Sequence, residues 1–200
     1  MPSFNLLPDG VTGTNNWLAP GFGGTACAAG NVDNDNDDTD YCQENAANGE
    51  ITFTMAAPGV TEAGIASIDS VTVISKMRYT AGSGTTFIRT DLQGGGVTHT
   101  QDQYNVAAGS SYSTYTGDVE TTRDGTNPWE YSHIEGLEVQ FKKIVNAAAR
   151  TEVRLSYFYV EVAYTAAAAG YGNNVLGVDS GDIATINGVA TANISKVNGV

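Results

Sequence analysis

The densest group of chemically capable side chains in this sequence is an acidic segment between residues 33 and 44. It places oxygen-bearing side chains at alternate positions and a carboxylate at the twelfth position, which is the ligand spacing of a calcium-binding loop. The candidate ligands are Asp33, Asp35, Asp37, Thr39 and Glu44. The pattern predicts a Ca²⁺ site, because carboxylates this close together repel one another without a cation. The alternative is a solvated acidic loop, since Asp38 stands where such loops need glycine and no helical pattern flanks the segment.

Cys27 and Cys42, the two cysteines of the chain, flank this segment. A disulfide between them would close a loop of about 15 residues and stabilise the fold by about 3 kcal/mol. The first ten residues lack a basic and apolar leader, so we expect synthesis in a cytosol, which favours free thiols. A particle released from its cell would allow oxidation, and both states stay open. Two cysteines without a paired histidine are too few ligands for zinc.

Residue types that could catalyse a reaction form no recognisable pattern. His99 and His133 are the two histidines, and Asp102 is near His99 in the sequence, but no Gly-x-Ser-x-Gly motif occurs. Acidic residues are so common in this chain that a pair of carboxylates carries little information about glycosidase chemistry. We therefore expect a protein that is not an enzyme.

Four aromatic residues with polar neighbours could bind a ligand instead. Aromatic rings in such surroundings can stack on sugar rings. The candidates are Tyr112, Tyr115, Trp129 and Tyr131. Trp129 follows a proline, and the competing interpretation makes it a buried plug under a loop.

The elements that must position these residues are β-strands. Residues 153–165 form the longest β-type run, apolar on both faces and free of glycine and proline, which indicates a central strand. Further strands are expected at 51–55, 67–79, 85–92, 99–106, 111–116 and 137–144. The strand at 85–92 carries charged positions at Arg89 and Asp91. About eight short strands with turn signals between them predict an all-β fold, an antiparallel β-sandwich of jelly-roll type.

Changes of composition divide the chain into four expected segments. These are an extended N-terminal arm rich in glycine and proline (1–24), the β-sandwich domain (25–165, including the acidic loop 25–49), a linker (166–174) and a repeat tail (175–200). Trp17 and Phe22 are the expected anchors of the arm on the body of the protein.

The tail repeats its pattern every eleven residues. Its apolar positions are Val175, Val178, Ile183, Ile186, Val189, Ile194, Val197 and Val200. A glycine in each copy, mostly after asparagine, disfavours a helix and favours a turn. One copy is too short to bury its own apolar residues, so we expect the tail to anchor the protein or to form a homotrimer. The alternative is a disordered tail, because small residues order poorly alone.

The charge of the chain excludes two classes of partner. The net charge is −13, with 9 basic residues that form no cluster, so nucleic acid and anionic membranes are not expected partners. No run approaches the roughly 20 apolar residues that span a membrane.

Two stretches resemble structural proteins of tailed phages. The stretch Asn127-Pro128-Trp129, followed by an apolar strand and by residues 154–164 (RLSYFYVEVAY), resembles the C-terminal half of a β-sandwich domain that recurs in these proteins. Residues 186–200 (INGVATANISKVNGV) resemble repetitive endings of phage and marine-virus virion proteins. The resemblance covers roughly residues 50–200 and leaves the acidic loop outside.

This resemblance implies a virion structural protein without enzymatic activity. A capsid decoration, cement or head-fibre protein on the particle surface is expected, made in the host cytoplasm and anchored through its termini. Its partners would be the major capsid protein or tail proteins, together with copies of itself. The competing hypothesis is a glycan- or receptor-binding module of a tail or tail fibre.

Overall fold

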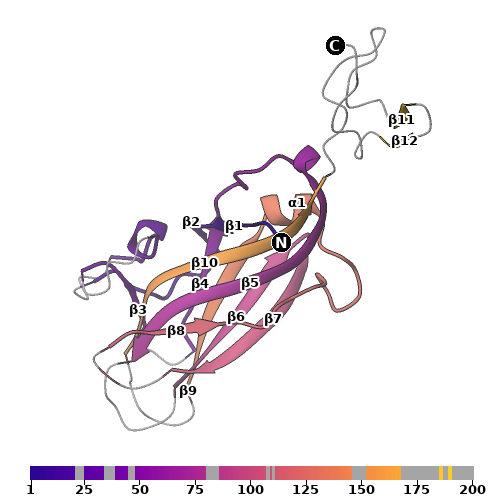
Figure 1. Cartoon of the computed structure of the whole chain (residues 1–200). Helices are drawn as coiled ribbons and strands as arrows, with labels where there is room; N and C mark the ends of the chain where they lie inside the picture. Colours follow the sequence, from indigo (N-terminus) through magenta and orange to yellow (C-terminus); the bar gives the residue numbers. More distant parts are fainter. Residues whose placement is uncertain are drawn as a thin grey trace.

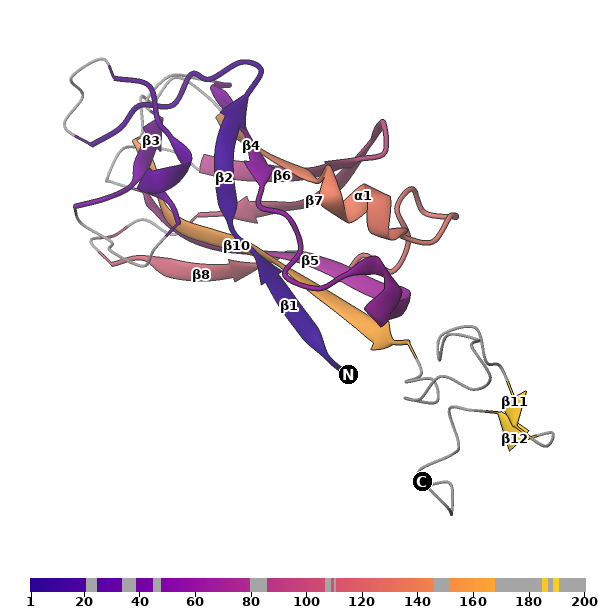
Figure 2. The same ribbon diagram turned by 90° about the horizontal axis from the view of Figure 1, so that it is seen from above.

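The chain folds as an antiparallel β-sandwich of two sheets (Figure 1). The computed structural model describes residues 1–20, 25–33, 39–44, 48–79, 86–106, 109, 111–145, 152–167, 185–186 and 189–190. Figure 2 shows the two layers from above.

The first sheet, which we call sheet A, is built around two long central strands. Its order is β1 (Ser3–Leu6), β10 (Val153–Ala166), β5 (Ile65–Tyr79) and β8 (Ser113–Thr116), and β3 (Cys42–Glu44) also pairs with β10. β10 and β5 pair from Val153↔Tyr79 to Ala166↔Ile65. β10 has neighbours on both sides, which confirms that the long apolar run is a central strand.

The second sheet, sheet B, lies opposite and carries the features discussed below. Its order is β2 (Pro8–Thr12), β4 (Glu50–Met55), β9 (Glu138–Val145), β6 (Thr86–Gly94) and β7 (Val97–Asn105). Without the N-terminal strands β1 and β2, the sheets have the orders β3-β10-β5-β8 and β4-β9-β6-β7. These interleaved orders are those of a jelly roll, so the predicted fold class is confirmed.

Few residues lie in other regular elements. The part of the chain that the structure describes has two short 3₁₀ turns, η1 (Ala29–Asn31) and η2 (Glu62–Gly64), and the helix α1 (Tyr131–Glu135). Within the described residues, α1 is the one α-helix, and its five residues are far too few to cross a membrane. β11 (Thr185–Ile186) and β12 (Val189–Ala190) pair antiparallel with each other.

The N-terminal residues differ from the expected extended arm. β1 pairs with β10 and β2 pairs with β4, so residues 3–12 form strands of both sheets. The prolines that suggested an arm are compatible with this, because Pro8 is the first residue of an edge strand and its missing N–H interrupts no ladder. Trp17 is fully buried, as expected of an anchor, and Phe22 lies outside the described residues.

Three phenylalanine rings join the two sheets at the centre of the core. Phe158 of β10 lies 4.9 Å from Phe53 of β4 and 4.9 Å from Phe141 of β9, measured between ring centroids. All three side chains are 0 % exposed. Tilted and edge-on contacts of this kind stabilise a core beyond the burial of apolar area, so these rings fix how the sheets pack.

Candidate functional site

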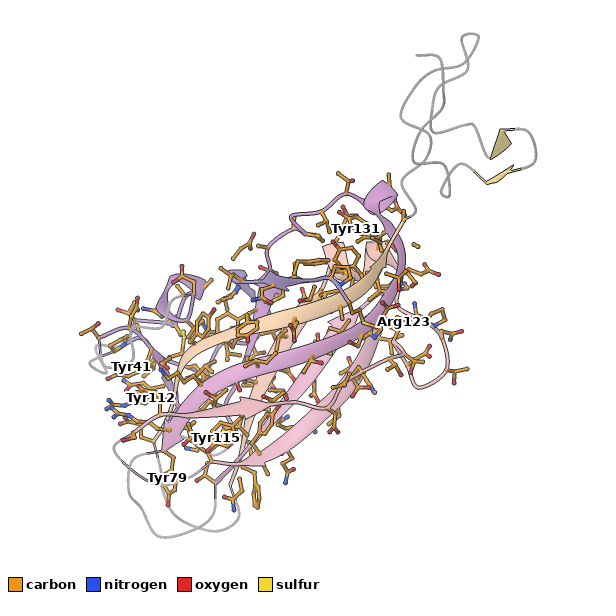
Figure 3. The ribbon with its side chains drawn as sticks, viewed as in Figure 1. Tyr41, Tyr79, Tyr112, Tyr115, Arg123 and Tyr131 are labelled. Atoms are coloured by element: carbon orange, nitrogen blue, oxygen red, sulfur yellow. A yellow bond between two sulfur atoms is a disulfide. The ribbon has the colours of Figure 1, made fainter. Side chains whose placement is uncertain are left out.

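The four aromatic residues expected to form a sugar-binding platform do not come together, and Figure 3 shows Tyr131 far from Tyr112 and Tyr115. Trp129 is 3 % exposed, and its Nε1 donates to the Glu120 carbonyl oxygen at 3.1 Å. Tyr131 donates its hydroxyl to the Val60 carbonyl oxygen at 2.7 Å, at the far end of the sandwich from Tyr112 and Tyr115. The proposed platform is therefore replaced by a buried tryptophan and separated tyrosines. Trp129 belongs to the hydrophobic core, as the competing interpretation of a buried plug predicted.

The other two tyrosines face opposite sides of sheet A. Tyr115 packs against the core, with its ring centroid 5.4 Å from that of Tyr104. Tyr112 stacks with Arg78, whose guanidinium carbon lies 4.6 Å from the ring centroid. Arg154, opposite Arg78 in the β5–β10 register, stacks on Tyr41 at 4.4 Å. The two tyrosine rings cover two guanidinium groups of like charge on neighbouring strands. This structural role explains the positions of Tyr112 and Tyr41 without a ligand.

The expected calcium ligands are only partly described. Asp33 and Thr39 are exposed, whereas Asp35 and Asp37 lie outside the described residues. Glu44 is 2 % exposed, and its negative charge acts on Lys143 of β9. Because Glu44 is buried with an ammonium group, a cation at its carboxylate would compete with Lys143. Calcium binding by the segment stays a prediction.

Lys143 is itself a buried charge inside the sandwich. It is 0 % exposed, and its Nζ donates to the Glu44 carbonyl oxygen at 3.1 Å. Burial lowers the pKa of Lys143, and the charge of Glu44 opposes that effect. The pair attaches β3, which follows the acidic segment, to the interior of the sandwich.

Cys27 and Cys42 form a disulfide, with their Cα atoms 5.5 Å apart. The bond holds the segment around Trp17 on β3. The backbone N–H of Cys27 donates to the Trp17 carbonyl oxygen at 2.9 Å, and Leu18 exchanges backbone bonds with Gln43.

The apolar positions of the C-terminal repeat are described at Ile186 and Val189 alone. These two residues face each other in the β11–β12 pair. The remaining positions, Val175, Val178, Ile183, Ile194, Val197 and Val200, lie outside the described residues.

A different surface, the outer face of sheet B, collects the polar side chains of four neighbouring strands. We call it the polar face. On β4, β9 and β6 the alternate residues are buried in the core, so these side chains point away from it, and the register of β7 with β6 places Thr98, Thr100 and Gln103 beside them. The polar face consists of Glu50, Thr52, Thr54, Glu138, Gln140, Lys142, Arg89, Asp91, Gln93, Thr98, Thr100 and Gln103.

Asp91 lies at the centre of the polar face. In register, it is flanked by Gln140 of β9 and Thr100 of β7. Its Oδ2 accepts two hydrogen bonds from Arg89, from Nε at 3.0 Å and from Nη2 at 2.7 Å. Its Oδ1 is buried and has no hydrogen-bond partner in the part of the chain that the structure describes.

This unpaired oxygen is unusual for its position. The Asp91 side chain is only 1 % exposed although it lies on the outer side of a sheet. A buried acceptor without a donor costs about 1–3 kcal/mol, and more when it is charged. Natural structures leave few such atoms, and each calls for an explanation. The oxygen has no accessible surface, so a ligand hydroxyl reaches it only after the side chains that cover Asp91 move.

The rest of the polar face offers both donors and acceptors. Gln140 donates from Nε2 to Thr52 Oγ1 at 3.2 Å, which leaves its carbonyl oxygen as a further acceptor. Lys142 and Glu50 form an ion pair at 3.3 Å. Amide, hydroxyl, carboxylate and guanidinium groups thus alternate over one rigid surface, and the arrangement suits recognition by hydrogen bonding.

A pocket of about 290 Å³ lies at one end of the polar face, lined by residues 93–98, Gly136 and Glu138. Figure 2 shows the β6–β7 connection and α1 at this same end of the sandwich. Gly95 and Gly96 have positive φ values, 59° and 78°, which a tight turn needs.

Sequence reasoning recognised the strands of this surface but missed the surface itself. The outward alternation of polar residues on β9 and the charges on β6 were visible signals. Only the strand register shows that Asp91, Gln140 and Thr100 are neighbours.

Comparison with known proteins gives a likeness of fold. No protein-family profile and no curated protein sequence matches the chain. Among solved structures, a CBM29-2 variant complexed with mannohexaose is 12% identical, over 81% of this chain and 93% of that chain, with a TM-score of 0.40. The CBM22-1 xylan-binding domain of Paenibacillus barcinonensis Xyn10C is 11% identical, over 81% and 94%, with a TM-score of 0.40.

A CBM4 structure is 12% identical, over 74% of this chain and 95% of that chain, with a TM-score of 0.38. At these values the likeness concerns the sandwich architecture and carries no argument about what this chain binds.

Proposed function

We propose that this protein is a non-enzymatic binding module that holds a hydroxyl-rich glycan on the polar face of sheet B. The observation that carries the proposal is the alternation of hydroxyl, amide, guanidinium and carboxylate groups on this one outward-facing surface, whose centre holds the buried Asp91 carboxylate with its unsatisfied Oδ1. A sugar hydroxyl donates to an amide oxygen and accepts from a guanidinium or a hydroxyl, so one ligand type could bond Gln140, Arg89 and Thr100 together.

The position of the polar face also supports a binding role. Its side chains project from paired strands, which hold them more rigidly than loops would. Pre-ordered donors and acceptors lose little conformational freedom when a ligand binds, and this raises affinity. Neither histidine of the chain lies on the polar face.

The test compares two threonine substitutions on opposite sides of the sandwich. Thr100→Val removes a hydroxyl beside Asp91, whereas Thr116→Val removes one from β8 of sheet A, and both residues are exposed. A glycan array should identify a ligand for the unmodified protein, and titration calorimetry with that glycan should show weakening by about fivefold or more in Thr100→Val. Asp91→Asn should abolish binding.

The matched control Thr116→Val should bind as the unmodified protein does. Equal weakening by both threonine variants, or an array without reproducible binding, would refute glycan recognition by the polar face.

The hairpin in the C-terminal repeat favours a second candidate function. Ile186 pairs with Val189 across an Asn-Gly dipeptide, as a repeated turn motif would require. We propose that the repeat anchors the sandwich on a virion or joins three copies of it, so that a capsid decoration or fibre protein displays the polar face outward. The two proposals are compatible, because display of many copies strengthens weak glycan binding.

Deletion of residues 175–200 tests the second candidate. Light scattering coupled to size exclusion should show a homotrimer for the full chain and a monomer for the shortened one. An unchanged oligomeric state, together with unchanged incorporation into particles, would contradict anchoring by the repeat.

A further inference from the structure

We propose that the pocket beside the polar face binds the uncharged terminal sugar ring of the glycan. This inference rests on the proposed glycan-binding function and specifies which part of the glycan is recognised. It starts from the continuity of the two surfaces. Gln93 lies opposite Glu138 on one side and Thr98 on the other, and these three residues are both the last row of the polar face and part of the pocket.

The distance between the pocket and Asp91 suits a single ligand. Asp91 and Gln93 are alternate residues on the same face of β6, so their Cα atoms are about 7 Å apart by the strand rise. A glycan with one ring in the pocket would therefore bring the next ring close to the unpaired Oδ1 of Asp91.

The wall of the pocket is rigid because its glycine-rich turn packs against α1. A Cβ atom on Gly94 would lie 3.1 Å from the His133 carbonyl oxygen, and one on Gly95 would overlap the His133 ring. His133 is fixed in turn, since its Nδ1 accepts the Glu130 backbone N–H at 3.1 Å and its Nε2 lies 2.8 Å from Arg123 Nη1. The pocket is thus formed before a ligand arrives.

The chemistry of the lining selects an uncharged ring. Glu138 is the one charged side chain in the described lining, and Gln93 and Thr98 add an amide and a hydroxyl. A carboxylate accepts hydrogen bonds from sugar hydroxyls and repels the carboxylate of an acidic sugar. A volume of about 290 Å³ is at the small end of ligand sites, which fits one ring rather than several.

The turn also explains why the terminal ring is recognised. The polar rows of β9, β6 and β7 end at the β6–β7 connection, where the pocket lies. The end of a glycan chain laid along these rows therefore reaches the pocket.

The experiment fills the pocket without straining the backbone. Gly136 has an ordinary φ of −106°, and a Cβ there would meet its nearest atom, the Ser132 carbonyl oxygen, at 4.0 Å. Gly136→Val should therefore fold and occlude the pocket. Gly59→Val is the matched control, since Gly59 is exposed, has open space around a Cβ and lies elsewhere. Melting temperatures verify that both variants are folded.

Calorimetry with neutral hexasaccharides of glucan, mannan and xylan, and with an oligogalacturonate, gives the readout. For the neutral probe that binds, Gly136→Val should weaken affinity at least about tenfold and Glu138→Gln several-fold, with no change in Gly59→Val. Affinity per mole of chain should stay constant as the same sugar chain is lengthened, because each chain has one such end. The oligogalacturonate should not bind.

Two results would overturn the inference and separate it from the proposed function. If Asp91→Asn abolishes binding but Gly136→Val does not weaken it, the polar face binds glycan and the pocket does not. If affinity per mole of chain rises in proportion to chain length, or the oligogalacturonate binds more tightly, an internal or acidic segment is recognised instead. If none of the neutral probes binds, both the function and the inference fail.

Discussion

Removing the Cys27–Cys42 disulfide should destabilise the protein by about 3 kcal/mol. The bond closes a loop of 15 residues, and the chain-entropy relation gives about 10 cal/mol/K for a loop of this length, or about 3 kcal/mol at 25 °C. The perturbation is Cys27→Ala with Cys42→Ala, because both side chains are buried and serine would leave hydroxyls there. For a domain of this size the melting temperature should fall by about 6–12 °C.

The two tryptophans make the effect measurable near the bond and far from it. Trp17 is fully buried, and its carbonyl oxygen accepts the Cys27 backbone N–H, so its fluorescence reports on the linked segment. Urea unfolding would be followed in a Trp129→Phe background, in which Trp17 is the remaining tryptophan, with and without the two alanine substitutions. The same measurement in a Trp17→Phe background reports on the opposite end of the sandwich.

If the free energy of unfolding measured by Trp17 fluorescence falls by less than about 1 kcal/mol, the reasoning is refuted, because closure of the loop then contributes little to stability. Reduction of the unmodified protein should reproduce the loss seen in the double variant. If only the alanine variant is destabilised, the effect comes from lost packing and not from the cross-link.

Three further predictions follow from the core and the charged groups. Phe158→Ala should lower the free energy of unfolding by about 3–5 kcal/mol in urea, since the ring is fully buried between Phe53 and Phe141, and a loss below about 1 kcal/mol would count against this packing. Burial lowers the pKa of Lys143, so the unfolded chain binds more protons, and the free energy of unfolding should rise with pH from the lowered pKa up to 10.5. Lys143→Met should flatten that rise. If the slope of the free energy of unfolding against pH is unchanged in this variant, the rise comes from other titratable groups. Hydrogen bonds from the Asn127 side chain and backbone hold the pKa of Asp124 well below 3.8. Their contribution to the free energy of unfolding is therefore fully present above pH 3.8 and is lost only as the pH falls through the lowered pKa. The carboxyl carbon of Asp124 should show no NMR titration between about pH 5 and pH 3, and a midpoint near 3.8 would contradict the bonds.

Most strands of the sandwich could be predicted because their alternation is local. β5, β6, β9 and β10 lie within a few residues of the ranges expected from the sequence, and the two apolar faces of β10 indicated its central place. Each of these signals lies within one strand, where the side chains alternate with a period of two residues.

The N-terminal strands were missed because their evidence is not local. Residues 3–12 are short and contain proline and glycine, so nothing within them indicates pairing. Their partners, β10 and β4, are far away in the sequence, and tertiary pairing outweighs weak local preference.

The polar face could not be predicted either, because its evidence is also not local. The sequence marks Arg89 and Asp91 as charged residues on a strand, but their relation to Gln140 and Thr100 depends on the register of three strands. The aromatic platform was wrong because its tyrosines lie in different parts of the fold, whereas the competing interpretation of Trp129 as a buried plug is confirmed.

The pairing of β1 with β10 has a consequence for how the protein is made. Ser3 lies opposite Ala163, so β1 leaves the ribosome long before β10, the strand with which it pairs. Until residue 163 emerges, β1 has no partner in sheet A and the nascent chain exposes an open sheet edge. Closing so long a loop is slow, and unpaired edges invite association between chains. Efficient production should therefore depend on chaperones that protect the N-terminal strand while it waits.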